Sequence, residues 1–148
     1  MNREPLHQLL SQTECCGIYR LPPDSREALR HATEFLGHAC FEIDFQELGK
    51  IPSVLKTLGQ QLGFPNWYGA NLDALSDCLT DFSWHESCGY VLVIFGADTL
   101  HATSSAFAQI NAVFAHVIEE WRTQDIPFWI FYDMSADDLP PLTLPVRE

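Results

Sequence analysis

The segment Tyr90-Val-Leu-Val-Ile-Phe95 is an unbroken run of six apolar residues, and glycines at positions 89 and 96 bound it. Strands that read as continuous apolar runs are typical of sheets covered on both faces, because each face then needs apolar side chains. The run therefore predicts a central strand of a parallel sheet with helices packed on it.

Two further strands and three helices are predicted around this run. Large apolar side chains occupy every second position from 41 to 45, which predicts a strand over residues 39–45 with one buried face. The apolar and aromatic residues 128–132 predict a last strand. Helical spacing of apolar residues predicts a helix that begins at Pro52, a second over 71–80 and a third over 103–122. Strands alternating with helices imply parallel strands joined by crossovers, so the predicted fold class is α/β.

The two ends of the chain differ from this central pattern. Residues 17–21 predict a short strand, and residues 24–36 predict a helix that ends at Gly37. This strand and helix could extend the sheet by an edge strand and a covering helix, or could form a second contact surface. The tail has no clear period and is expected to be irregular. We therefore expect an N-terminal extension over 1–37, a central domain over 38–133 and a C-terminal tail over 134–148.

Acidic residues dominate the surface of this 148-residue chain, whose formal net charge is -12. The segment from Thr57 to Trp121 contains seven carboxylates and no Lys or Arg, so it contributes -7 of that total. A negative surface repels phosphates, which argues against direct binding of nucleic acid. A basic protein is the more suitable partner.

Cysteine usage and hydropathy indicate the compartment. Five cysteines without a C-x-x-C pair do not suggest a disulfide framework. The N-terminus lacks the order of a secretion signal, and no apolar run approaches the roughly 18 residues that span a bilayer. We expect a reduced, cytoplasmic protein with no membrane segment, monomeric when unbound.

Three carboxylates follow one face of the helix predicted over 71–80 and just beyond it. Asp73, Asp77 and Asp81 are spaced at i, i+4 and i+8, opposite a stripe of leucines. Like charges at this spacing destabilise a helix by a few tenths of a kcal/mol, about 0.2–0.5 per pair, so stability does not select them. Trp67 lies in the loop just before, and aromatic side chains beside clustered charge are typical of protein-binding surfaces. The alternative is a solvated polar face without a partner.

Residues 64–82, which contain N-L-D-A-L-x-D-C-L-T from Asn71, resemble the core signature of the barstar family, intracellular inhibitors of secreted ribonucleases. The resemblance covers roughly residues 38–133. It implies a three-stranded parallel sheet packed by helices. It also implies inhibition, in which the acidic helix and the loop before it enter the basic active-site cleft of the nuclease.

The resemblance further implies a set of partner-binding residues. Asp73 and Asp77 match two interface aspartates, of which Asp77 is the central one, and Trp67 matches an interface tyrosine. Glu120 falls where a further interface glutamate is expected. Gly69 and Asn71 belong to the same motif and complete this part of the predicted set.

Three positions depart from the family pattern. Ser76 and Phe82 stand where the family has tryptophans, so hydrophobic anchors that carry much of an interface's energy are missing. Asp81 replaces a glycine, and the resemblance implies no role for it. These departures suggest a partner that differs from the best-known nuclease.

Enzymatic and metal-binding hypotheses have less support. His85 and Cys88 could be drawn as an imidazole–thiol pair, but proximity in a loop is weak evidence and no catalytic residue is assigned. The three aspartates could hold Mg²⁺, but phosphate chemistry would also need cations that this segment lacks. No metal or cofactor is predicted. The main alternative is an immunity or regulatory protein that binds a different basic toxin or host protein, because a scaffold does not fix its partner.

Overall fold

The computed structural model describes residues 4–21, 24–65 and 68–134. Its centre is a four-stranded sheet in the order β1-β4-β3-β2, in which every neighbouring pair is parallel. The strands are β1 (Ile18–Arg20), β2 (Ala39–Asp44), β3 (Tyr90–Phe95) and β4 (Phe128–Asp133). The α/β class and the run 90–95 as an inner strand are confirmed.

The expected sheet of three strands gains a fourth. Residues 18–20 of the N-terminal extension form β1 and pair with β4, with Ile18 opposite Ile130. The backbone N–H of Leu21 continues this pairing and donates to the carbonyl of Tyr132 at 2.8 Å. The family resemblance alone therefore described the sheet incompletely, and the extension supplies its edge.

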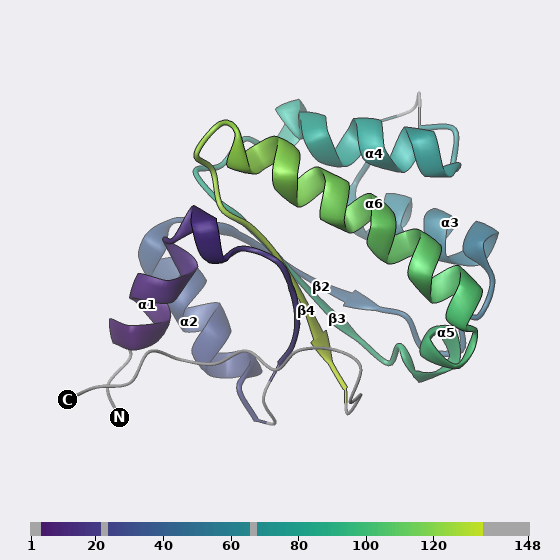
Figure 1. Cartoon of the computed structure of the whole chain (residues 1–148), viewed down its shortest axis with the longest axis horizontal. Coiled ribbons are helices and arrows are strands. Elements are labelled where there is room, and N and C mark those ends of the chain that lie inside the picture. Colours follow the sequence, from purple (N-terminus) through teal and green to yellow (C-terminus); the bar gives the residue numbers. More distant parts are fainter. Residues whose placement is uncertain (1–3, 22–23, 66–67, 135–148) are drawn as a thin grey trace.

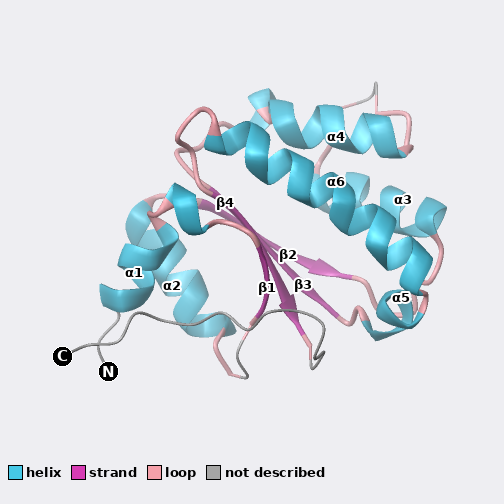
Figure 2. Cartoon of the chain, viewed as in Figure 1, coloured by secondary structure: helices cyan, strands magenta, loops and turns pink. Residues whose placement is uncertain are grey.

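Helices cover both faces of the sheet (Figure 1 and Figure 2). Two helices lie on one face and four on the other. The first group is α1 (Glu4–Leu10) and α2 (Arg26–Leu36); the second is α3 (Ile51–Leu62), α4 (Leu72–Asp81), α5 (Asp98–Ala102) and α6 (Ser104–Arg122). No helix among the described residues is long and apolar enough to cross a bilayer.

Two helices were not predicted from the sequence. Leu6, Leu9 and Leu10 of α1 are buried. They stand at i, i+3 and i+4, so they form one helical face within an otherwise polar segment. α5 precedes the long helix, and the break at Thr103, with φ -97° and ψ 80°, separates it from α6. The predicted boundaries of the remaining elements differ from those observed by a few residues at most.

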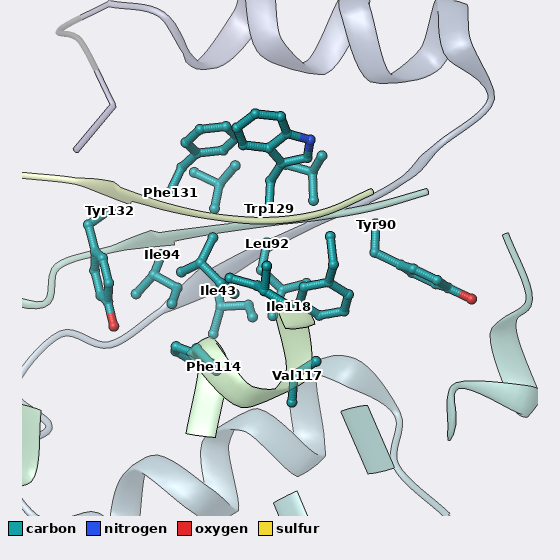
Figure 3. Packing of buried hydrophobic residues seen from close by; sticks show 14 of the residues in the cluster. Ile43, Tyr90, Leu92, Ile94, Phe114, Val117, Ile118, Trp129, Phe131 and Tyr132 are labelled. Atoms are coloured by element: carbon teal, nitrogen blue, oxygen red, sulfur yellow. The ribbon is translucent and has the colours of Figure 1, made fainter. Parts of the chain in front are cut away.

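The core consists of two layers, one on each face of the sheet. Leu92 and Ile94 of β3 point toward Phe114 of α6, whereas Trp129 and Phe131 of β4 point to the opposite face (Figure 3). All five side chains are fully buried. This alternation explains why β3 and β4 read as continuous apolar runs.

Hydrogen bonds over long sequence distances attach the extension to the rest of the molecule. The indole N–H of Trp129 donates to the carbonyl of Leu10 at 3.1 Å. The guanidinium of Arg122, at the end of α6, donates to the carbonyl of Thr13 and, at 3.0 Å, to that of Cys16. The extension therefore contacts both the sheet and the long helix.

Candidate functional site

α4 presents a carboxylate face to solvent. Asp73, Asp77 and Asp81 are exposed, while Leu75 and Leu79 on the other side of the helix are fully buried. The predicted separation of an acidic stripe from a leucine stripe is therefore what the structure shows. The helix offers its three carboxylates along one exposed line.

Local contacts fix both ends of α4. At the start, the side-chain oxygen of Asn71 accepts a hydrogen bond from the backbone N–H of Ala74 at 2.7 Å, which is N-terminal capping. At the other end, the indole N–H of Trp121 in α6 donates to the carbonyl of Leu79 at 2.8 Å. The position of the acidic face is thus set by the helix cap and by the contact with α6.

Tyr68 anchors the loop before α4 to α3. Its hydroxyl donates to the carbonyl of Leu55 at 2.8 Å, and its ring meets Phe64 edge-on with centroids 4.7 Å apart. The ring also lies over Gly59, where an added Cβ would be 2.7 Å from a ring carbon. Burial raises the pKa of Tyr68 to about 12, so the phenol stays protonated as a donor. Gly69 next to it is exposed, and Trp67 lies outside the described residues.

Arginines pair with acids away from α4. Arg26 in α2 contacts Asp133 at 3.1 Å, on the opposite side of the sheet, and Arg122 contacts Glu119 at 3.0 Å. Glu120 follows Glu119 on α6 and is exposed. Because the segment 57–121 contains no Lys or Arg, the acidic face has no cation of its own segment to neutralise it.

Glu120 lies on the flank of α6 that faces α4. His116, one helical turn earlier, lines a groove together with Asp73 and Ser76 of α4. Residues four apart occupy the same face of a helix, so Glu120 continues this flank toward the end of α6. The structure therefore brings the predicted Glu120 to the same side of the molecule as the predicted aspartates.

Phe82, predicted as a partner-binding residue at a family tryptophan position, has no exposed surface, because it continues the buried leucine stripe of α4. Its side chain is fully buried and stacks on Tyr90, with centroids 4.7 Å apart, and on Phe41. The backbone at Phe82 is left-handed, with φ 49°, and ends α4 with a hydrogen bond to the carbonyl of Cys78. Phe82 is therefore a packing residue in this structure.

Sequence reasoning did not identify the groove between α4 and α6. It has a volume of about 460 Å³, and Leu72 and Ser76 form one wall while Ala112 and Val113 form the other. The small residues Ser76 and Ala112 were the available signal. Their significance depends on how the two helices pack, which the helical spacing of either one does not reveal.

Cys78, Cys88 and His85 have separate surroundings in the structure. Cys78 is buried, and its burial, reinforced by the carboxylates of Asp77 and Asp81, raises the pKa of the thiol to about 11. The thiol of Cys88 faces the carbonyl of Gly37 at 3.5 Å, while the ring of His85 packs against Phe41. Within the described part of the chain, no three His, Cys, Asp or Glu side chains are grouped so that they could hold a metal ion.

A comparison with protein families supports the sequence resemblance. The family model described as Barstar (barnase inhibitor) matches residues 38–133, which is well over half of the chain and includes the whole of α4 and α6. A search of curated proteins found no match.

Proposed function

Because the chain belongs to the barstar family, we propose that it inhibits a basic ribonuclease and blocks the active site with α4 and the loop before it. The exposed acidic face of α4 carries this proposal. Asp73, Asp77 and Asp81 stand in line on a helix held at both ends, in a segment without Lys or Arg. We assign the binding function to residues 38–133.

The electrostatics of a nuclease cleft suit this surface. A ribonuclease must attract phosphates, so its cleft is cationic, and carboxylates placed there take the positions of phosphate groups. An anionic ridge also raises the association rate by steering, and more strongly at low salt. Steering accounts for the local excess of acid better than helix stability does, since the spacing of the aspartates works against the helix.

The predicted residues have different roles in this proposal. Asp77 is the central contact and Asp73 and Glu120 flank it, all on the exposed side shared by α4 and α6. Trp67 and Gly69 belong to the loop that enters with the helix. Asn71 supports the surface as the helix cap rather than through a direct contact alone.

A reducing compartment fits the cysteines. All five are free thiols, and burial raises the pKa of Cys16 to about 11, as for Cys78, so neither forms a thiolate readily. Free thiols persist in the cytoplasm, where disulfides are rare. We therefore place the inhibitor in the cytoplasm, as protection against a nuclease that acts elsewhere.

Asp77→Ala tests the proposal with barnase as the probe. Although Ser76 and Phe82 suggest a different natural partner, the aspartates of the family motif are present, so we expect wild-type protein to slow RNA cleavage by barnase. The variant should bind more weakly by at least about 2 kcal/mol, roughly 30-fold, because nuclease cations are left unpaired. Calorimetry measures the affinity and a fluorogenic RNA measures inhibition. Glu34→Ala is the matched control, because Glu34 is an exposed carboxylate on α2, across the sheet. Equal affinities for wild type and Asp77→Ala would contradict the assignment.

Ser76 favours a second candidate, an immunity or regulatory protein for another basic toxin or host protein. A small side chain at this position leaves the groove open, so the surface differs in shape from one that carries a tryptophan. A pull-down followed by an RNA-cleavage assay of the captured protein separates the two candidates. A basic partner without nuclease activity would favour the regulator, and a neighbouring gene for a basic secreted nuclease would favour the inhibitor.

A further inference from the structure

The groove between α4 and α6 opens beside the acidic face, and no side chain of the described residues occupies it. It has a volume of about 460 Å³ and is open to solvent rather than enclosed. Toward the ends of the two helices the space closes, where Trp121 contacts Leu79. Toward their middle the lining includes Ser76 of α4 and Ala112 and Val113 of α6, and none of these side chains is large enough to fill the space.

The walls of the groove are mainly apolar. Leu72, Ala112 and Val113 contribute hydrocarbon surface, and Leu72 and Val113 are only half-buried. Asp73 is the one carboxylate among the lining residues, and it lies on an exposed position. Apolar surface in a concave site gains most from a group that removes it from water, so the walls favour an apolar occupant over a charged one.

The negative charge around the groove indicates which kind of protein surface can bind there. Asp77 is adjacent to Ser76 in the sequence and continues the acidic line outside the groove, and the whole segment 57–121 lacks cations. A complementary surface is therefore basic around an apolar centre. Interfaces commonly have this form, with one large side chain seated in a pocket and polar pairs around it.

We propose that the partner nuclease carries a large apolar side chain, aromatic or aliphatic, that enters the groove beside Ser76 while neighbouring cations pair with Asp73 and Asp77. This inference rests on the proposed function, because it assigns a contact to the same surface. It makes Ser76 a specificity-determining residue. The bulk that is missing from α4 comes from the partner.

A titration of the full-length chain with two small probes tests the chemistry of the groove. The probes are p-cresol, for an apolar ring, and methylguanidinium, for a cation, and the readout is the amide shifts of isotope-labelled protein. We expect p-cresol to shift Leu72, Ser76 and Val113 in wild type and in Asp77→Ala. Ser76→Trp and, as a second filled variant, Ala112→Trp should abolish these shifts. A stronger response to methylguanidinium, or no response to either probe, would overturn the inference.

Selection from a library of inactive barnase with randomised surface positions tests the contact itself. We expect variants that bind the wild-type chain to gain Phe, Trp, Leu or Met at one position, and to bind Ser76→Trp at least tenfold more weakly. The groove contact would be refuted if the selected barnase variants gained Arg or Lys at that position. It would also be refuted if they bound Ser76→Trp as tightly as the wild-type chain.

Loss of binding in Asp77→Ala serves as the separate check on the proposed function. Selected variants that depend on Asp77 but not on Ser76 would leave inhibition standing and remove the groove contact. A library without any binder would instead count against the nuclease partner, while the p-cresol titration decides the groove independently.

Discussion

Ser76 and Phe82 belong to the same motif, but their side chains have different surroundings. Ser76 is half-buried at the wall of the groove, whereas Phe82 is fully buried between Tyr90 and Phe41. The difference arises because Phe82 continues the buried leucine stripe of α4, whereas Ser76 lines the groove. Two substitutions that look alike in the sequence therefore have different consequences, one for binding and one for stability.

Phe82→Ala should destabilise the fold by about 3–5 kcal/mol, the usual cost of removing a fully buried phenylalanine ring. Urea unfolding measures the change. Phe35→Ala is the matched control, because Phe35 is 74% exposed on α2 and should change stability by far less. If Phe82→Ala unfolds like wild type but loses affinity for barnase, the ring is a contact residue after all.

His38 makes stability depend on pH in one direction. Its ring lies against Gly89, its Nδ1 atom is buried without a hydrogen-bond partner among the described residues, and burial lowers the pKa of the imidazole from 6.5. The unfolded chain therefore binds the proton more readily than the folded one. The stability that neutral His38 contributes is fully present above about pH 6.5 and is lost as the pH falls toward the lower pKa of the folded state.

His38→Gln should reduce this loss, so that its unfolding midpoint in urea changes less than that of wild type between pH 7.5 and pH 5. His116→Gln is the control, because His116 is exposed on α6. A wild-type protein whose stability rises as the pH falls through this window would contradict the assignment of His38.

The side chain of Asn71 caps α4, and two substitutions at this position test how much the cap contributes to the stability of the protein. Asn71→Ala removes the acceptor for the Ala74 N–H and should cost about 1 kcal/mol, within the usual 0.5–2 kcal/mol for an N-cap. Asn71→Asp keeps an acceptor and should retain the stability. Thermal melting of the two variants measures the difference. Equal losses for both would show that Asn71 acts through something other than the cap.

The sequence predicted α4 well because two independent signals agree there. The leucine stripe requires a buried side, and the aspartates at i, i+4 and i+8 require an exposed one. The start of α6 was predicted to within one residue, but α5 before it was not, because Leu100 alone among its five residues is buried and shows no helical period. α1 was missed because three leucines in a polar segment are a weak signal without the sheet face that they cover.

The relative placement of helices could not be predicted from periodicity. Each helical pattern shows which side is buried, but the groove depends on how α4 and α6 pack against each other. Phe82 continues the spacing of the leucine stripe, three positions after Leu79, so its burial follows from periodicity, whereas the left-handed backbone at this non-glycine residue does not. The candidate carboxylates were accessible to sequence reasoning because exposure follows from their spacing alone.

For the whole molecule, Arg122 connects the extension to the long helix. Its guanidinium donates to the carbonyls of Thr13 and Cys16 and contacts Glu119. Arg122→Ala leaves these partly buried acceptors without their donor and should cost about 1–3 kcal/mol in unfolding free energy. Chemical denaturation measures the loss, and Lys56→Ala, at an exposed position on α3, is the control. A change no larger than that of Lys56→Ala would show that the extension is attached independently of Arg122.

Deletion of residues 1–37 tests the whole extension. It removes β1 together with α1 and α2 and uncovers one face of the sheet, including Trp129 and Phe131. We expect a large fall in the melting temperature, with affinity for barnase retained in the folded fraction. A stable truncated chain with reduced affinity would instead identify the extension as a second contact surface.

The pairing of β1 with β4 also affects how the protein can fold during translation. Among the described strands, β1 is translated well before its partner β4, and the indole N–H of Trp129 donates to the carbonyl of Leu10, 119 positions earlier. In the sheet, β4 is the strand that pairs with β1, so this pairing cannot form until residues 128–133 have been translated. Such distant contacts slow folding and prolong the exposure of apolar surface. The leucines of α1 and the strand β4 therefore stay exposed until β4 joins the sheet, and a chaperone could bind this apolar surface during that time.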